Sequence, residues 1–424
     1  MAARPDSPSI GGRRLVPSLL RRDRVFRLFW SGQTISLFGD QVTYIALPLA
    51  AVLVLDASAA EMGYLLAAEL APNLLFSLHA GAWVDRRGRR RATMIAADLG
   101  RAGLIATVPV AYALDALSMT QLYVVAFLAG TFSVLFFVSH GTLFVSIVAR
   151  ERYVEANSLL HGSRAFSFVA GPSVGGVLVQ VLSAPIALLA DAVSYVVSAG
   201  MLARIAPVEP PTEQERKGAV VAGARFILRT PIFRSALLAT ATINFFNFMF
   251  AALFILYATR VLGIGAGTLG AVLGAGAVGG IIGSLVTGRV SRRIGIGPAF
   301  VLGCFLFPAP LVLVPLAGGP QPLVLAFLFI AEFGSGLGVM MLDISAASIY
   351  TAAVPDRLRA RFSGAYMVVN MGVRPLGSLL GGALGTAVGL RPTLVIATLG
   401  AIAGVLWLLP SPYPRMRELP EAQI

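Results

Sequence analysis

The chain has little charge, one cysteine and one lysine. Only 12% of its 424 residues are charged, whereas soluble domains carry about 25%. The single cysteine, Cys304, excludes an intrachain disulfide and a cysteine-based metal site. The three histidines, His79, His140 and His161, are too scattered along the sequence for a recognisable metal site or catalytic triad. We therefore expect neither an enzyme nor a bound metal or cofactor.

Nucleotide-binding motifs are also missing. The only lysine, Lys217, lacks the surrounding glycines of a phosphate-binding loop. The segment Gly274–Gly279 fits the pattern G-x-G-x-x-G, but it lies inside an apolar run with no preceding strand and no acidic partner. Such glycines are typical of packed membrane helices. The sequence therefore predicts no nucleotide hydrolysis by this chain itself, although a separate ATPase partner stays open.

Long apolar segments are present in place of these signals, and hydrophobic residues make up 57% of the chain. Runs of about 20 apolar residues have the length of a membrane-spanning helix. Lipid requires each backbone polar group to be bonded within the segment, which favours helices. We predict an all-α membrane protein with twelve transmembrane helices in two six-helix repeats. Their approximate spans are 26–55, 59–83, 92–113, 119–148, 156–181, 185–205, 234–258, 266–287, 298–316, 322–348, 362–387 and 391–410.

The net charge of +13 would suit nucleic-acid binding, but its distribution indicates a membrane topology instead. If the helices cross alternately, 28 of the 33 basic residues fall on one side of the membrane. The other side receives only Arg260 and Arg391. By the positive-inside rule, both termini are expected on the cytoplasmic side of a bacterial plasma membrane. We expect membrane lipids, and no nucleic acid, as partners of this charge.

A charged block in the first half of the chain recurs in the second half. Residues 81–91 (GAWVDRRGRRR) separate two apolar runs, and a weaker copy (GRVSRRIG) stands 207 residues later at 288–295. We predict that each block is a short water-exposed connector and that the chain consists of two related halves. The predicted divisions are an N-terminal cytoplasmic tail (1–25), an N-terminal half (26–205), a cytoplasmic linker (206–233), a C-terminal half (234–410) and a C-terminal cytoplasmic tail (411–424).

The first charged block resembles the signature G-x-x-x-D-R-x-G-R-[RK], which the major facilitator superfamily carries between helices 2 and 3. The segments Phe26–Gln33 and Gly39–Gln41 are similar to the branch that contains macrolide-efflux and enterobactin-exporter proteins. The resemblance covers the whole chain and implies a secondary transporter. The block is specific for the superfamily and carries almost no information about the substrate.

By resemblance, the block acts as a latch on the cytoplasmic side, which releases when the halves rock. The alternative is that its arginines only set the topology, and we expect that simpler role for Arg87, Arg90 and Arg91. The predicted latch residues are Gly81, Asp85, Arg86, Gly88 and Arg89.

Several charged residues inside the spans are predicted to form gates or structural pairs, because charge within a membrane needs a partner. Asp98 and Arg101 lie one turn apart near the cytoplasmic end of their helix. Asp343 is expected to pair with an arginine at the cytoplasmic gate. Arg374 is expected to neutralise a carboxylate, with an anionic substrate as the alternative. Asp191, expected near the outer end of its helix, is predicted to be structural.

The segment Gly171, Pro172, Gly175 and Gly176 resembles the core of the antiporter motif in helix 5 of the family. Ser167 stands where the fuller motif has another glycine. The resemblance implies export by exchange. Close helix packing with a possible bend is an equally open reading of the same residues.

Three carboxylates at mid-depth are candidates for proton coupling: Asp40, Glu69 and Glu332. A carboxyl group in a poorly solvated site can bind and release a proton near neutral pH. A buried structural hydrogen bond is the alternative. Polar and aromatic residues on the predicted inner faces would suit a cavity for a bulky amphipathic ligand. The substrate-cavity candidates are Gln33, Tyr44, Asn73, His140, Arg164, Asn244, Asn247 and Phe248.

Together these patterns predict proton-coupled efflux of a hydrophobic or amphipathic small molecule by alternating access. A drug, a macrolide-like compound or a siderophore would suit such a cavity. The sequence leaves open a lysophospholipid flippase, a metabolite importer and, as a different class, a non-transporting membrane sensor. The expected partners are the substrate, protons and lipids, and we expect a monomer.

Overall fold

The computed structural model describes residues 17–207 and 219–420. Residues 1–16, 208–218 and 421–424 lie outside this description, as do the side chains of residues 78, 82, 85, 219–222 and 360. Most of the predicted N-terminal tail and part of the predicted linker are therefore not described.

The described residues form helices and no strand. The bounds of the elements are α1 (Ser18–Arg22), α2 (Arg24–Leu53), α3 (Ala59–Arg87), α4 (Arg90–Ala113), α5 (Met119–Ile147), η1 (Arg150–Arg152), α6 (Tyr153–Leu182), α7 (Ala184–Ala203), α8 (Ala219–Arg229), α9 (Pro231–Arg260), α10 (Ala266–Ile294), α11 (Ile296–Leu306), η2 (Ala309–Val312), α12 (Leu313–Leu316), α13 (Gln321–Ala353), α14 (Asp356–Ala387), α15 (Leu390–Ala403), η3 (Gly404–Trp407) and η4 (Tyr413–Arg415).

Ten helical segments of the described chain are long and apolar enough to cross a membrane. The all-α membrane fold is thereby confirmed. The helices α3 and α14, of 29 and 32 residues, have comparable length but carry more charged residues. The count of twelve spanning helices stays a prediction.

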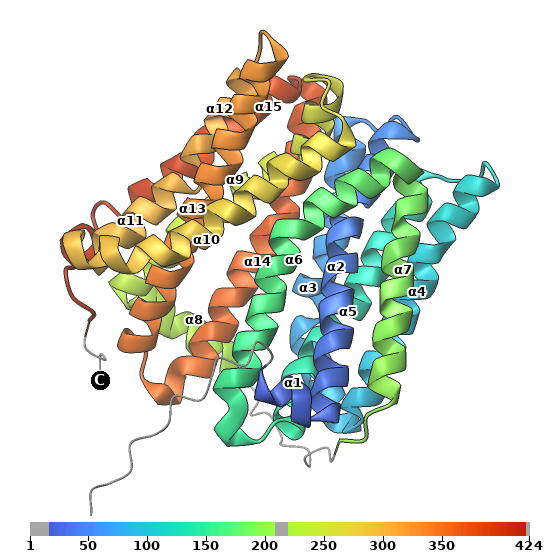
Figure 1. Cartoon of the computed structure of the whole chain (residues 1–424). Helices are drawn as coiled ribbons and strands as arrows, with labels where there is room; N and C mark the ends of the chain where they lie inside the picture. Colours follow the sequence, from blue (N-terminus) through green and yellow to red (C-terminus); the bar gives the residue numbers. More distant parts are fainter. Residues whose placement is uncertain (1–16, 208–218, 421–424) are drawn as a thin grey trace, which may run out of the picture.

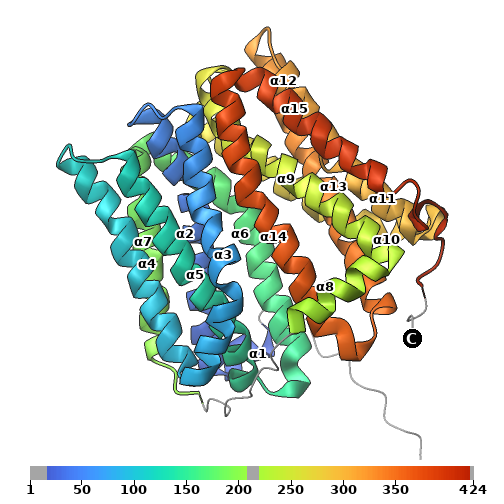
Figure 2. The same ribbon diagram turned by 180° about the vertical axis from the view of Figure 1, so that it is seen from behind.

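The long helices pack as two groups (Figure 1). In the first group α2 packs against α6 and α7, and α4 against α5 and α7. In the second group α9 packs against α14 and α15, and α13 against α10 and α11. Contacts between the groups run mainly through α3 with α14 and α6 with α10, and Figure 2 shows α3 and α14 side by side.

The bundle has two ends that differ in charge. The loops after α3, α5 and α13 lie at one end together with α1 and α8, at the bottom of Figure 1. We call this end the basic face, because its segments carry most of the arginines, such as Arg89, Arg150 and Arg357. The loops after α2, α4, α9 and α14 lie at the other end, the opposite face.

The internal repeat is visible in the contacts between the groups. A side chain at Gly63 of α3 would lie 2.8 Å from the Cα atom of Gly382 in α14. A side chain at Gly176 of α6 would lie 3.1 Å from the Cα atom of Gly270 in α10. Gly63 and Gly270 are separated by 207 residues, the same offset as the charged blocks. The two repeats therefore make equivalent contacts, each at backbone distance.

The charged blocks are helix ends, which corrects the predicted connector from residue 81. The helix α3 continues to Arg87 and α10 continues to Ile294. Each ends at a glycine in the left-handed region, Gly88 with φ 60° and Gly295 with φ 99°, a conformation that only glycine adopts at little cost. Charge excludes these turns from lipid, but it does not prevent the helix from continuing into water.

Two further boundaries differ from the sequence-based spans. The helix α2 begins at Arg24, inside the predicted tail, and Asp23 before it accepts a hydrogen bond from the N–H of Phe26 at 2.9 Å. The predicted linker contains a helix, α8, that was not expected. Its Phe226 ring packs against Phe233 of α9 at 5.4 Å and Phe362 of α14 at 6.5 Å.

Glycine faces allow α10 and α13 to pack at backbone distance. A side chain at Gly279 would overlap the carbonyl group of Phe333, and one at Gly283 would lie 2.6 Å from the carbonyl oxygen of Leu337. In lipid, such close backbone approach replaces the hydrophobic effect as the source of helix–helix attraction.

We expect Gly279→Leu to destabilise the fold, because overpacking a close contact costs roughly 1–3 kcal/mol. The control is Gly141→Leu in α5, where an added Cβ meets no atom within 4 Å and the better helix former should do no harm. Thermal unfolding of both purified variants in detergent measures the difference. Equal midpoints would contradict the packing described.

Candidate functional site

A cavity of about 280 Å³ lies between the two groups of helices. Its volume is close to the lower end of the range for small-molecule pockets, roughly 300–1,000 Å³. Apolar and aromatic side chains form most of the wall, with a few polar groups among them. The lining residues are Tyr44, Leu47, Pro48, Met62, Leu65, Leu66, Glu69, Asn247, Phe248, Phe250, Ala251, Ala252, Phe254, Ile255, Leu273, Phe307, Leu311, Glu332 and Ser335.

Five residues that the sequence singled out meet in this cavity. They come from four helices: α2, α3, α9 and α13. They are Tyr44, Glu69, Asn247, Phe248 and Glu332. Their placement is compatible with substrate contact, and their roles stay predictions.

Two carboxylates face the cavity from different helix groups. Glu69 of α3 is exposed to it, and Glu332 of α13 is half-buried in its wall. Among the described residues, neither carboxylate has a hydrogen-bond or ion-pair partner. An unpartnered carboxylate in an apolar region is available to a cationic ligand group or to a proton.

The two groups touch at the opposite face and separate toward the basic face. Beside the glycine contacts, Arg260 of α9 forms an ion pair with Asp56 in the loop after α2, which joins the groups at the opposite face. Nearer the basic face, Gly162 of α6 and Gly364 of α14 lie on the same helix faces as the contacting glycines. An added Cβ at either position would meet no atom within 4 Å.

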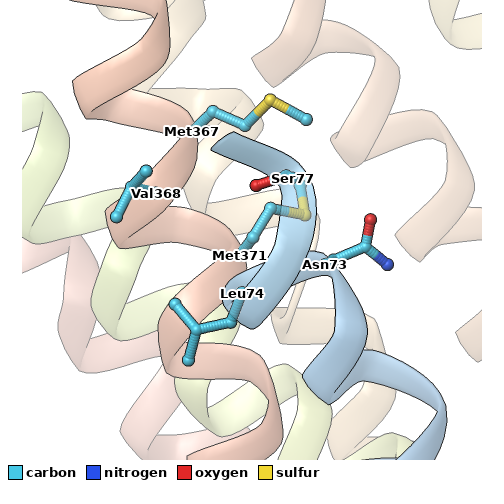
Figure 3. A pocket seen from close by; sticks show the side chains of 6 residues that line it. All are labelled: Asn73, Leu74, Ser77, Met367, Val368 and Met371. Atoms are coloured by element: carbon cyan, nitrogen blue, oxygen red, sulfur yellow. The ribbon is translucent and has the colours of Figure 1, made fainter. Parts of the chain in front are cut away.

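A narrow gap separates α3 and α14 on the basic-face side of the cavity (Figure 3). Its volume of about 10 Å³ is close to the space that one water molecule needs. Asn73 and Ser77 of α3 face Met367 and Met371 of α14 across it. Asn73, predicted as a cavity residue, therefore lines this gap and not the cavity.

Asp40 lies in a polar cluster inside the first helix group. Its Oδ1 atom accepts a hydrogen bond from the Tyr195 hydroxyl of α7 and lies 3.9 Å from an amino group of Arg101 in α4. The side chain of Asp40 is 38% exposed. It stands one helical turn from Tyr44, which lines the cavity. Asp40 thus connects this cluster with the cavity.

Asp98 and Arg101 form a buried ion pair in the same cluster. The sequence left open whether these two residues form a gate or a structural pair. The guanidinium of Arg101 lies over the ring of Tyr195 at 4.1 Å and over the ring of Phe136 at 4.6 Å. These two aromatic contacts stabilise the cation and fix its position. A gate role for this pair stays a prediction.

Asp191 was expected near the outer end of its helix, but it belongs to the same cluster. It lies two turns inside α7, where its carboxylate accepts hydrogen bonds from Thr43 of α2 and from Ser194 at 3.0 Å. A side chain at Gly39 would overlap these groups. Close approach of α2 and α7 therefore holds Asp191 beside Asp40.

Four predicted cavity residues lie elsewhere. Gln33 is buried, and His140 packs between Phe29 and Phe136, with ring separations of 5.2 and 6.4 Å. Arg164 is exposed on α6. Asn244 was expected to face inward, but it donates a hydrogen bond to Asn370 of α14 at 3.1 Å. Spacing along a helix predicts which residues share one face of that helix, but it does not predict which neighbouring helix that face contacts.

The predicted latch is only partly described, because the side chain of Asp85 lies outside the described side chains. Gly81 has no neighbour within 4 Å of an added Cβ. Gly88 caps α3, and the carbonyl oxygen of Arg89 accepts a hydrogen bond from Thr93 at 3.0 Å. Arg86 is exposed and has a partner. The latch role stays a prediction.

Three arginines of the block do more than set the topology. The guanidinium of Arg87 lies 4.4 Å from the ring centre of Trp83. Arg90 is 3% exposed, and Arg91 donates a hydrogen bond to the carbonyl oxygen of Ile205 after α7. The prediction of a topological role alone is therefore wrong for these residues, since packing uses their long side chains.

Arg374 contacts the edge of the cavity. Its guanidinium lies 4.8 Å from the ring centre of Phe248, which lines the cavity. In the described part of the chain, Asp343 has no ion-pair partner within 4.0 Å. Arg374 nevertheless lies near enough to interact with Asp343 electrostatically, so pairing of Asp343 with an arginine stays a prediction.

The helix 5 motif is buried at two helix contacts. Side chains at Gly171 and Gly175 would collide with Gln41 and Val42 of α2, within the first group. Gly176 faces α10 of the second group, and Pro172 lies beside it. The motif therefore provides close packing, and a direct part in exchange stays a prediction.

The sequence reading did not connect the members of the polar cluster. Asp191, Ser194, Tyr195 and Ser198 recur every three to four residues, so they share one face of α7. This spacing was the available signal. Among the described residues, no group of His, Cys, Asp and Glu could hold a metal ion.

The ion pair in the cluster gives a stability prediction. We expect Arg101→Gln to lower stability by about 3 kcal/mol or more, because it leaves a buried carboxylate without its partner. The double variant Asp98→Asn, Arg101→Gln should recover much of this loss. Thermal midpoints in detergent measure both effects. A single variant as stable as the wild type would contradict the pairing.

Comparisons with known proteins agree with this fold. The Major Facilitator Superfamily model matches residues 29–376. The chain is 29% identical over 416 residues to the multidrug efflux pump Tap of Mycolicibacterium fortuitum, which covers 90% of this chain and 93% of that protein.

Solved structures of low sequence identity share the fold. A bacterial homologue of the iron transporter ferroportin in the inward-facing state has a TM-score of 0.77 and 16% identity, over 93% of this chain and 99% of that one. A structure of a bacterial ferroportin homologue in the outward-facing state has a TM-score of 0.58 and 17% identity, over 91% and 97%.

Proposed function

The chain belongs to the major facilitator superfamily, and we propose that it exports an amphipathic small molecule across the plasma membrane in exchange for protons. The observation that carries this proposal is the cavity between the helix groups, with its aromatic wall and two unpartnered carboxylates. An apolar body and a basic group on the cargo would match these two features. A cationic drug or a macrolide-like compound with an amino group fits this description, whereas a siderophore, with acidic iron-binding groups, would match only the apolar wall. The similarity to a multidrug efflux pump supports the drug and the outward direction.

We assign the basic face to the cytoplasm, because arginine-rich segments remain on that side of a membrane. Both termini are then cytoplasmic. The cavity would open inward in this conformation, since the groups touch at the opposite face. The higher TM-score with the inward-facing structure supports this assignment.

Alternating access would follow from rocking of the two groups, residues 26–205 and 234–410, as a monomer in lipid. The glycine contacts and the Asp56–Arg260 ion pair close the outer side in the inward-open state. In the outward-open state these contacts separate, and the basic face closes. The residues proposed to hold that closed basic face are Gly81, Asp85, Arg86, Gly88, Arg89, Asp98, Arg101, Asp343 and Arg374.

Exchange needs carboxyl groups that are occupied in turn by a proton and by cargo or an internal cation. Asp40, Glu69 and Glu332 are available for this purpose, since each can be reached from the cavity region. A proton arriving from outside would neutralise a carboxylate after the cargo leaves, which allows the empty protein to return. Unpaired charge would otherwise oppose the return step.

Purified protein in proteoliposomes tests the proposal. An imposed pH gradient, with the lumenal pH followed by a dye, is combined with a panel of lipophilic cations, macrolides and siderophores. We expect at least one compound to trigger a proton flux that protein-free vesicles lack. Silence across the panel from folded protein would contradict proton-coupled export of these cargoes.

A pair of variants shows whether the flux uses this cavity. Removing an aromatic contact from a binding site costs more than about 1 kcal/mol, so Phe248→Ala should weaken the response roughly fivefold or more. The matched control is Phe137→Ala in α5, whose side chain is 66% exposed away from the cavity. Equal loss in both variants would argue against the cavity as the binding site.

A further inference from the structure

We propose that Asp40, Asp98 and Asp191, gathered around Arg101, form the proton-binding site, and that Glu69 and Glu332 bind the cargo. This division of roles rests on the proposed proton-coupled export. It assigns proton binding and cargo binding to two different groups of carboxylates, whereas a site in the cavity alone would combine them. None of the three cluster aspartates is among the residues that line the cavity, and Asp40 stands one helical turn from Tyr44, which does line it.

The cluster contains three carboxyl groups and one guanidinium, and two of the carboxyl groups lie within 4 Å of that guanidinium. Arg101 pairs with Asp98 and has Asp40 at 3.9 Å. Asp191 is joined to them through α7, where Tyr195 donates its hydroxyl hydrogen bond to Asp40. If all three carboxyl groups were ionised, the cluster would carry two uncompensated negative charges inside the membrane. Because such charge is costly there, the cluster must take up protons.

Asp98 has one carboxylate oxygen that Arg101 does not occupy. Asp98 and Ser198 are both 0% exposed. The Oδ2 atom of Asp98 and the hydroxyl of Ser198 have no hydrogen bond of normal geometry, although Ser198 lies near enough to interact with the Asp98 carboxyl group. A hydroxyl group can donate or accept, so Ser198 can serve Oδ2 in either protonation state: it can donate to the ionised oxygen or accept from the protonated one. Asp98 could therefore take up a proton on Oδ2 without displacing Arg101 from Oδ1.

Asp40 is the point of entry. Its side chain is 38% exposed, whereas Asp98 and Asp191 are fully buried. Protons would exchange with cavity water at Asp40. Arg101 lies within reach of both Asp98 and Asp40, so it can favour whichever of the two is ionised. Loss of a proton from Asp40 would draw the guanidinium toward it and favour protonation of Asp98.

The surroundings of the cluster contain few other charges. From α3, Glu69 is near enough to interact with Asp40. From α5, His140 packs against the ring of Phe136, and the guanidinium of Arg101 lies over the same ring. From α6, Arg164 interacts with His140. From α7 itself, Tyr195 completes the set. Among the described residues, Arg101 is therefore the cation that pairs with Asp98 and Asp40, and it acts on Asp191 only through space.

The helix α2 would couple the two sites. Asp40 and Tyr44 stand one turn apart on this helix, the first in the cluster and the second in the cavity wall. The cluster is built from α2, α4 and α7 of one helix group, whereas Glu69 and Glu332 belong to different groups. Cargo between the two carboxylates would bridge the groups, and protons in the cluster would act within one group.

Infrared difference spectra between acidic and alkaline solution test the site without any cargo, because they report carboxyl groups that gain protons. We expect Asp98→Asn and Asp191→Asn each to remove titrating carboxyl signal, and Asp40→Asn to remove or shift it. The control is Asp115→Asn in the exposed loop after α4, which should leave in place the carboxyl signals that the cluster variants lose. Thermal midpoints establish that each variant is folded. Because three variants are made separately, the test still works if one of them fails to fold. Spectra that match the wild type in all three would overturn the proposal.

A binding measurement with tetraphenylphosphonium tests the division of roles. Tetraphenylphosphonium has no hydrogen-bond donor, so its attraction to the carboxylates is electrostatic, and Glu69→Gln and Glu332→Gln should each weaken binding by roughly tenfold or more. Asp191→Asn should retain binding but lose cargo-triggered proton flux in proteoliposomes. Proton flux that survives Asp98→Asn and Asp191→Asn, yet is lost in the two glutamate variants, would overturn the division. The wild type could also show titrating carboxyl groups and yet export cargo without moving protons. That result would refute the proposed proton coupling, but not the proton-binding site itself.

Discussion

The exclusion of unpaired charge from lipid is the constraint on which the rest of this structure depends. It sends the arginines to one face of the bundle and places Arg101 between the rings of Phe136 and Tyr195, in contact with Asp98. The same constraint makes Glu69 and Glu332 informative, because carboxylates without protein partners persist in such a region when something else occupies them. Stability and function are therefore linked through the same few charged groups.

Backbone proximity is the second element of the account. The contacts of Gly63 with Gly382 and of Gly176 with Gly270 bring the helix groups together without side chains between them. Contacts of this kind are weak enough to separate, since no large apolar side chain has to leave a packed site and lipid drives no hydrophobic association. Their repetition in both halves of the chain gives the bundle two equivalent contacts beside the cavity, which can form and separate together.

Much of this could be predicted from the sequence, because hydropathy and charge act locally. The helical membrane fold, the recurring block and five of the cavity residues followed from spacing along single helices. The positions of Asp191 and Asn244 did not, because their partners, Thr43 and Asn370, come from helices that are distant in sequence. The helical end of α3 was missed for a different reason: hydropathy marks where lipid ends, and Gly88 marks where the helix ends.

Distances between spin labels would test alternating access most directly. One pair, at positions 154 and 285, reports the basic face, and another, at 114 and 388, reports the opposite face; the native residues, Val154, Leu285, Leu114 and Val388, are all exposed. Labels are attached to cysteines in a Cys304→Ala background, with and without cargo and at acidic and alkaline pH. The account predicts two states in which one distance lengthens as the other shortens. Distances that stay fixed, or that change in the same direction, would contradict it.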